Sequence, residues 1–412
     1  MLTQRLLLTL AVSSSFWSLS QGYQVNFQGQ KQQGMGSVGT GMVLDGSAVF
    51  FNPGAITHLD KNSINLAVTP VKANILFEEE GSHAIGRTNS PISTPFSLYA
   101  TYIPKKHRQM GFGLGIYTPF GSTISYENGW VGRFALTKLQ LMSIYVQPTF
   151  SYKINEKLGI GGGFVLCYGK VNLQKDLPIQ FADSTYASAD LSGTSLGYGG
   201  NFGLYYKASD KWSFGLSYRM QVNMNLKQGD ATFNVPTAVD DKFPDGKFVS
   251  SLPLPQVASF GAAYQPIEKL KVGFDFNFVG FKAYDTLAFD YEQNTASLED
   301  TKLPRMYKNA YVFRLGGQYD ISKMISVRAG ASYSLSPVQN GYITPETPDN
   351  NRLSYTAGLS IRPHAQFHID LSFLFAKVVR TGYNAETNLK GTFTTYAFAP
   401  GIGLIYNFKD EK

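Results

Sequence analysis

The stretch Ser47-Ala-Val-Phe-Phe-Asn-Pro-Gly-Ala-Ile-Thr-His-Leu59 separates two styles of sequence. The segment before it, from about Gln21, is rich in Gly and Gln and shows little strand alternation. After it, polar and apolar residues alternate almost to the end of the chain. Pro53 fixes φ and lacks an N–H donor, and Gly54 allows a sharp bend, so a turn here explains the change. We interpret the pattern as a plug set inside a barrel, although local chemistry fits an ordinary loop before the first strand equally well.

The composition is typical of a β protein that meets lipid. Aromatic residues make up 14% of the 412 residues, with 25 Tyr, 30 Phe and 41 Gly. Charged residues make up only 16%, against roughly 25% in soluble domains. The basic residues behind the net charge of +7 are scattered, which argues against a nucleic-acid partner. We therefore expect lipid to surround the protein.

The first twenty residues read as an export signal. Arg5 precedes a short apolar run over residues 6–12, and Ser18 and Ser20 supply small residues at a cleavage site. Seven apolar residues are too few to span a bilayer. We predict a signal peptide over residues 1–20, a hatch over 21–59 and a transmembrane barrel over 60–412.

Period-two alternation identifies the strands of this barrel. Phe214, Leu216, Tyr218, Met220 and Val222 are predicted to share one face, with small or polar residues between them. The same pattern recurs at residues 271–278, 368–375 and 401–408. A soluble sandwich would alternate too, but it rarely needs so many long strands with one wholly apolar face.

Short polar turns set the number of strands. They occur at residues 104–109, 155–157, 209–211, 267–269, 321–323 and 363–366. Six such turns on one side join seven hairpins, which predicts an all-β fold, an antiparallel barrel of about fourteen strands. Long loops are predicted at the other end, over residues 180–194, 229–254, 292–308 and 339–352.

Several motifs resemble those of the FadL family of outer-membrane transporters for long-chain fatty acids and aromatic hydrocarbons. They are Tyr117-Thr-Pro-Phe-Gly121, Gly129-Trp-Val-Gly-Arg-Phe134 and Leu252-Pro-Leu-Pro-Gln256, and the likeness extends from about Gly22 to Phe408. The resemblance implies a monomeric bacterial outer-membrane barrel of fourteen strands with an N-terminal hatch. It implies uptake of a hydrophobic ligand by diffusion, without a cofactor.

The family mechanism is capture at the outside, transfer to an apolar pocket and sideways exit through a gap in the wall. Asn52 and Pro53 match an Asn-Pro-Ala sequence that ends the family hatch, whereas Gly54 lacks the alanine methyl, which should loosen the turn. Gly111, Gly113 and Gly115 lie on one face of the matching third strand. They either kink that strand at the lateral opening or make room for the hatch, and the two roles are compatible.

A carboxylate headgroup would need a cation near the pocket. Lys308, in Tyr-Lys-Asn-Ala-Tyr, resembles the family segment that supplies a headgroup lysine. Arg314 and Lys170 are predicted on inward faces, and Arg133 follows the loop of the third strand. For each of the four, pairing with an acidic residue is the simpler interpretation.

The alternatives are an outer-membrane lipid-processing enzyme and an adhesin barrel. The five histidines show no metal-ligand spacing and HExxH does not occur, so no metal site is expected. Among them, His368 with Asp370 on one strand face is the one candidate for catalysis. An adhesin would depend on its long loops and would not need the hatch.

Overall fold

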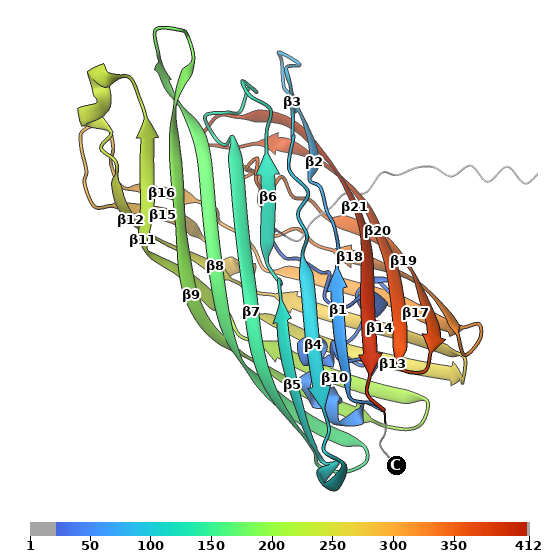
Figure 1. Cartoon of the computed structure of the whole chain (residues 1–412). Coiled ribbons are helices and arrows are strands. Elements are labelled where there is room, and N and C mark those ends of the chain that lie inside the picture. Colours follow the sequence, from blue (N-terminus) through green and yellow to red (C-terminus); the bar gives the residue numbers. More distant parts are fainter. Residues whose placement is uncertain (1–21, 410–412) are drawn as a thin grey trace, which may run out of the picture.

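The computed structural model describes residues 22–409, which form a closed antiparallel β-barrel (Figure 1). Each strand of the barrel wall pairs with the next wall strand along the chain, and the first and last wall strands pair to close the ring. The predicted signal peptide lies outside the described residues. The ring consists of fourteen strands: β1 (Ser63–Val68), β4 (Phe96–Tyr102), β5 (Met110–Tyr117), β7 (Lys138–Lys153), β8 (Leu158–Gln180), β9 (Tyr186–Lys207), β10 (Trp212–Arg219), β13 (Val257–Ile267), β14 (Leu270–Val279), β17 (Ala310–Asp320), β18 (Ile325–Ser334), β19 (Arg352–His364), β20 (Phe367–Tyr383) and β21 (Lys390–Asn407).

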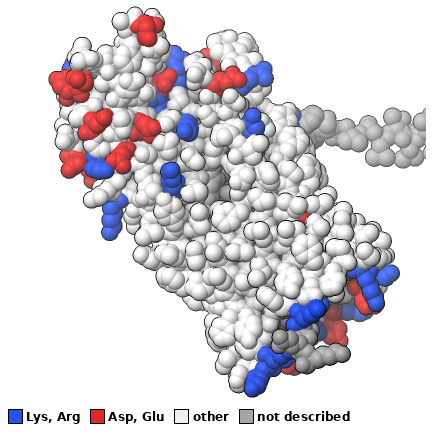
Figure 2. All heavy atoms as spheres, viewed as in Figure 1, with Lys and Arg blue, Asp and Glu red and all other residues white. Residues whose placement is uncertain are grey.

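All six predicted short turns join consecutive wall strands at one end of the barrel, called here the turn end. Apolar side chains on alternate positions point outward, as at Leu216, which is 52% exposed. Figure 2 shows the result, a broad band without charges between two charged ends. One strand face was predicted wrongly: Val222 is buried, because β10 ends at Arg219 and the chain changes phase before it enters β11.

The opposite end, the loop end, contains more strand than predicted. Residues 180–194 and 229–254 are largely strand and not open loop, because β8 and β9 extend beyond the band and a further hairpin pairs with β9. Pairing satisfies backbone groups even where side chains are polar, so polarity did not reveal these strands. The elements at this end are β11 (Val222–Asn234), η3 (Thr237–Lys242), β12 (Gly246–Leu254), η4 (Phe281–Ala283), β15 (Thr286–Tyr291) and β16 (Thr301–Pro304).

The wall is irregular beside its third strand. After β5 the chain leaves the ladder at residues 118–120 and resumes as β6 (Gly121–Ser125), which pairs with β7. On the neighbouring side, β1 is interrupted and followed by β2 (Asn74–Glu79), which pairs with β21 and with β3 (Ile85–Arg87). The short η2 (Lys105–His107) lies in the turn between β4 and β5.

Residues 22–59, called here the hatch, pack inside the barrel and contain α1 (Gln30–Gln33), α2 (Ala48–Phe51) and η1 (Pro53–His58). Figure 1 shows the hatch in blue near the turn end. Every residue from 28 to 42 is buried. Hydrogen bonds run to opposite walls, from Gln33 to the Ala399 carbonyl (3.2 Å) and from Asn52 to the Leu204 carbonyl (2.9 Å). Among the described residues, no helix has the length and apolar character needed to cross a membrane.

Candidate functional site

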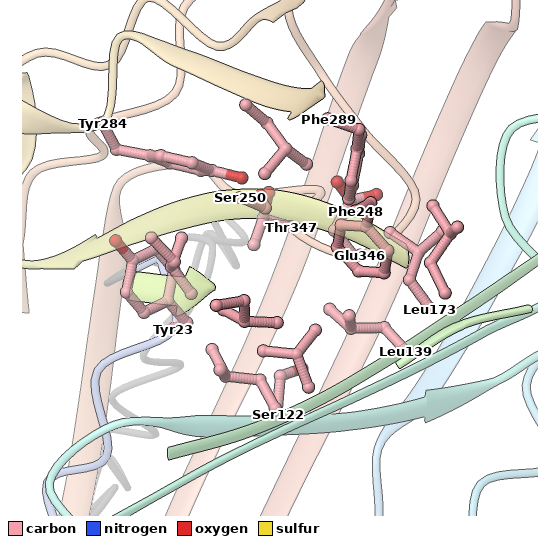
Figure 3. A pocket seen from close by; sticks show the side chains of 16 residues that line it. Tyr23, Ser122, Leu139, Leu173, Phe248, Ser250, Tyr284, Phe289, Glu346 and Thr347 are labelled. Carbon is pink, nitrogen blue, oxygen red and sulfur yellow. The ribbon is translucent and has the colours of Figure 1, made fainter. Parts of the chain in front are cut away.

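An apolar cavity of about 60 Å³ lies toward the loop end, between the barrel wall and the β11–β12 and β15 strands (Figure 3). Eight aliphatic side chains, from the wall strands β7, β8 and β9 and from β11, β12 and β15, form most of its surface. The lining consists of Tyr23, Ser122, Leu139, Leu141, Val171, Leu173, Leu191, Leu226, Phe248, Ser250, Leu252, Tyr284, Leu287, Phe289, Glu346 and Thr347. Such a surface favours an apolar ligand, since burying each CH₂ group gains roughly 0.8 kcal/mol.

Two hydroxyl groups of the cavity are already bonded to the protein. The Tyr23 hydroxyl donates to the Pro253 carbonyl (2.5 Å), and the Ser250 hydroxyl donates to the Ala288 carbonyl (2.7 Å). Burial raises the pKa of Tyr23 well above its usual value, so this hydroxyl stays neutral. Little is therefore left to hydrogen-bond a ligand.

The single charged lining residue, Glu346, belongs to a buried ion cluster. Arg305 lies 3.3 Å from Glu346 and 3.8 Å from Glu386, which joins three loop-end segments. Burial raises the pKa of Glu386, and Arg305 opposes that change. The Tyr307 hydroxyl lies 2.5 Å from that of Thr347 and fixes the same corner of the cavity.

A larger pocket of about 670 Å³ opens in the irregular part of the wall. Its sides come from residues 71–75 and 91–96 on one flank and 118–124 on the other, with the start of the hatch behind them. On the face shown in Figure 2, the uncharged band is hollowed near this region. Four residues line both this wall pocket and the apolar cavity: Ser122, Leu141, Glu346 and Thr347. We call these four residues the partition.

The three glycines of the third strand contact the hatch and do not border the wall pocket. A Cβ on Gly113 would lie 2.5 Å from Val49 Cγ2, and one on Gly111 would lie 3.0 Å from Ile56 Cγ2. A Cβ on Gly115 would lie 3.1 Å from Val49 Cγ1. Pairing of β5 with both neighbours continues through this region, and the strand is interrupted only at residues 118–120. The glycines make room for the hatch, and their role in lateral opening stays a prediction.

The hatch turn at Asn52 is fixed by its own side chain. Asn52 donates to the carbonyls of Thr40 (2.8 Å) and Leu204 (2.9 Å) and accepts from the Gly54 N–H (3.1 Å). A Cβ on Gly54 would lie 2.7 Å from the carbonyl oxygens of both Gly159 and Gly203. The expectation that Gly54 loosens the turn is therefore wrong, because the missing methyl lets the turn seat closely against β8 and β9.

The four cation candidates are not brought together. Lys308 is exposed, and Lys170 lies on the outer face of β8, so its predicted inward orientation is wrong. On β8 the lumen face carries Val165 and Cys167 while Tyr168 points outward, so polarity did not identify the inner side. Neither lysine lines the apolar cavity or the wall pocket.

Arg133 and Arg314 have other partners. Arg133 donates to the carbonyls of Gly129 (3.3 Å) and Trp130 (3.1 Å) within its loop and lies 3.9 Å from Asp176. Arg314 is buried against the hatch and donates to the Ser37 carbonyl (2.8 Å). It too is absent from the linings of the apolar cavity and the wall pocket.

His368 and Asp370, the candidate catalytic pair, are bonded to other residues. Asp370 accepts a hydrogen bond from Ser360 and lies 3.6 Å from Arg328, whereas His368 lies 3.3 Å from the Asn407 amide. Within the part of the chain that the structure describes, no group of three or more potential ligands could hold a metal ion.

Sequence reasoning missed the partition. Ser122 directly follows one of the motifs noted in the sequence, the Tyr117–Gly121 segment, and that motif was a usable signal. Glu346 and Leu141 carried none, because only the folded chain brings their segments together.

A closed fourteen-stranded barrel with a filled lumen, an apolar cavity and a pocket in its wall defines a class of outer-membrane channel for hydrophobic molecules. The family model "Outer membrane protein transport protein (OMPP1/FadL/TodX)" matches residues 10–409, and the chain belongs to this family. The family consists of transporters of hydrophobic compounds in the bacterial outer membrane and not of enzymes. The turn end is therefore the periplasmic end.

Individual relatives are distant but extend over nearly the whole chain. The long-chain fatty acid transport protein of Escherichia coli (strain K12) is 21% identical, covering 94% of this chain and 96% of its own. Outer membrane protein P1 of Haemophilus influenzae (strain ATCC 51907 / DSM 11121 / KW20 / Rd) is 22% identical over 80% of this chain and 78% of its own.

Solved structures share the fold. A Pseudomonas aeruginosa FadL homologue superposes with a TM-score of 0.81 at 18% identity, covering 94% of this chain and all (100%) of that one. The toluene transporter TodX of P. putida superposes with a TM-score of 0.74 at 18% identity, covering 92% of this chain and 98% of that one.

Proposed function

We propose that this protein, acting as a monomer, takes up a hydrophobic small molecule such as a long-chain fatty acid or an aromatic hydrocarbon by diffusion. The ligand enters the apolar cavity from outside, crosses the partition into the wall pocket and leaves sideways into the membrane. No nucleic acid, cofactor or ATP takes part.

The observation that carries the proposal is the shared lining of the two spaces. Ser122, Leu141, Glu346 and Thr347 line both the cavity and the wall pocket, and the wall pocket borders the interruption of the third strand. A ligand that crosses them passes from the apolar cavity into a pocket of mixed polarity in the wall. It touches only the start of the hatch, at Tyr23 in the cavity and at Val25 and Phe27 in the wall pocket, and bypasses the buried polar groups of residues 28–42, which would offer no gain to a hydrocarbon.

The ligands named by two relatives, fatty acids and toluene, are consistent with this path. The cavity favours the apolar part of either one, since none of the four predicted cations lines it. We further propose that the hatch, including Asn52, Pro53 and Gly54, stays seated during transport. A seated hatch closes the lumen to water while the sideways path remains available.

Replacing Ser122 by Phe tests the path. A bulky ring at the partition should lower uptake of a radiolabelled ligand about tenfold, the effect of about 1.4 kcal/mol. The barrel should keep its heat-modifiable migration on gels, because the substitution leaves strand pairing intact. Ser297→Phe, at an exposed loop position, is the matched control and should transport normally. Normal uptake by a folded Ser122→Phe protein would contradict the sideways path.

A further inference from the structure

A second, polar chamber lies between the hatch and the wall, apart from the apolar cavity. It has a volume of about 20 Å³ and shares no lining residue with that cavity. Arg219 at the end of β10 and Arg314 on β17 line it from the wall, and Asn26 and Phe50 line it from the hatch. Arg219 and Arg314 are only 5% and 6% exposed. Two guanidinium groups therefore share a small buried space.

These two arginines lack the carboxylate partners that other buried lumen cations have. Lys31 lies 3.7 Å from Asp45, and Arg328 lies 3.6 Å from Asp370. Within residues 22–409, Arg219 and Arg314 form no such ion pair. An arginine cannot shed its proton in a protein, and an uncompensated buried charge is costly.

The contacts of Arg219 stabilise its charge only in part. Its Nη2 donates to the Phe50 carbonyl (2.8 Å), and its guanidinium lies 3.8 Å from the centre of the Phe50 ring. Its Nε is buried and has no hydrogen-bond partner among the described residues. A cation–π contact contributes about 2 kcal/mol when desolvated, but it adds no negative charge.

The one carboxylate in the neighbourhood is directed elsewhere. Asp275 accepts from the backbone N–H groups of Gly39 and Thr40, both at 2.9 Å, and acts on Arg314 only through space. Arg352, a further buried cation, also acts on Arg314 through space and is itself offset by Asp349. The two guanidinium groups of the chamber are left with the single charge of Asp275, which favours one further negative charge there.

We propose that this chamber binds a small monovalent anion of the size of chloride. A space of about 20 Å³ accommodates one sphere of roughly water size, since a single water needs at least about 10–15 Å³. A carboxylate carried on a hydrocarbon chain is too large. The free Nε of Arg219 and the guanidinium of Arg314 supply the donors, and the Asn277 amide can add another after a flip. The anion joins β10, β14 and β17 to the hatch and stabilises the seated plug.

Bromide, a halide visible by anomalous diffraction, is the probe. Crystals of the full chain grown in bromide should show an anomalous peak within hydrogen-bond distance of Arg219 and Arg314. In detergent at constant ionic strength, exchanging gluconate for bromide should raise the midpoint of thermal unfolding by about 2 °C or more. Gluconate serves as the reference because it is too bulky for the chamber.

Arg219→Gln and Arg314→Gln should each abolish the bromide dependence. Arg328→Gln is the matched control: it removes an equally buried lumen arginine that has its own carboxylate, so it should lower the midpoint and keep the dependence. A water in place of the peak, or a midpoint indifferent to bromide in the unmodified protein, would overturn the proposal. Neither readout involves transport, so the result is independent of the uptake path.

Discussion

The two halves of the lumen are built from opposite contacts. Near the periplasmic end, the hatch contacts the wall through close backbone contacts and hydrogen bonds, together with the side chains of Val49 and Ile56. A Cβ on Gly316 or Gly330 would collide with the backbone of Met35. Near the loop end, leucine and phenylalanine side chains surround a cavity. The first arrangement cannot shift without breaking hydrogen bonds, whereas the second can deform at the cost of dispersion contacts alone. The contacts between the hatch and the wall, called here the seal, therefore lie at a different level of the barrel from the apolar cavity and the wall pocket, called here the path.

Gly316→Val should produce the largest effect, because it attacks the seal. The new side chain would overlap Met35 backbone atoms, and neither partner can turn away. We expect a loss of about 1–3 kcal/mol in stability and a displaced hatch that raises ion conductance in planar bilayers.

The adjacent Gly317 provides the control for that variant. It points the other way along β17, where a Cβ would meet only the Lys271 carbonyl at 3.2 Å and Val272 at 3.8 Å. Gly317→Val should keep conductance low. Equal conductance in both variants would mean that the hatch contact is not the seal.

Leu173→Phe should act on the path alone. The larger ring would fill part of the 60 Å³ cavity and should lower uptake about tenfold, while conductance stays low. The stability change should stay below about 1.5 kcal/mol, as for other hydrophobic swaps with repacking. Leu196→Phe, on the outer face of β9 at 58% exposure, should transport normally. Raised conductance in Leu173→Phe would mean that a change in the cavity also disturbs the hatch contacts, so the two regions would not be independent.

The sequence predicted the seal better than the path. Period-two alternation and six polar turns determined the barrel, because lipid requires an apolar outer face on every wall strand. Asn52 and Pro53 were identifiable because turn chemistry is local. The partition was not, since Ser122 and Glu346 come from segments far apart in the chain. The inward orientation predicted for Lys170 was wrong for a related reason. The lumen face of β8 is apolar, so polarity does not distinguish the inner face of this strand from the outer one.

Lys308→Ala sharpens the account of the path. Lys308 is exposed and outside both lining sets, so its loss should change uptake of a fatty acid and of its uncharged methyl ester equally, by less than about twofold. Paired uptake assays measure the ratio. A selective loss of the fatty acid would restore the headgroup role that the family resemblance implies.

His58 offers the smallest and most local test of the seal. Burial, and after it the charge of Lys153, lowers the pKa of His58 from 6.5 to about 4. In the unfolded chain the imidazole takes up a proton as the pH falls through 6.5, whereas in the folded hatch it stays neutral until about 4. The unfolded state therefore binds more protons in this window, and the free energy of unfolding should fall as the pH decreases from 6.5 to 4. Because the side chain is partly exposed, solvent screening should limit its contribution to about 1 kcal/mol. His58→Gln should flatten that slope in thermal unfolding measured across the window, and His83→Gln, in an exposed turn at the loop end, should leave it as it is. A slope that survives His58→Gln would assign the acid sensitivity of the hatch to other groups.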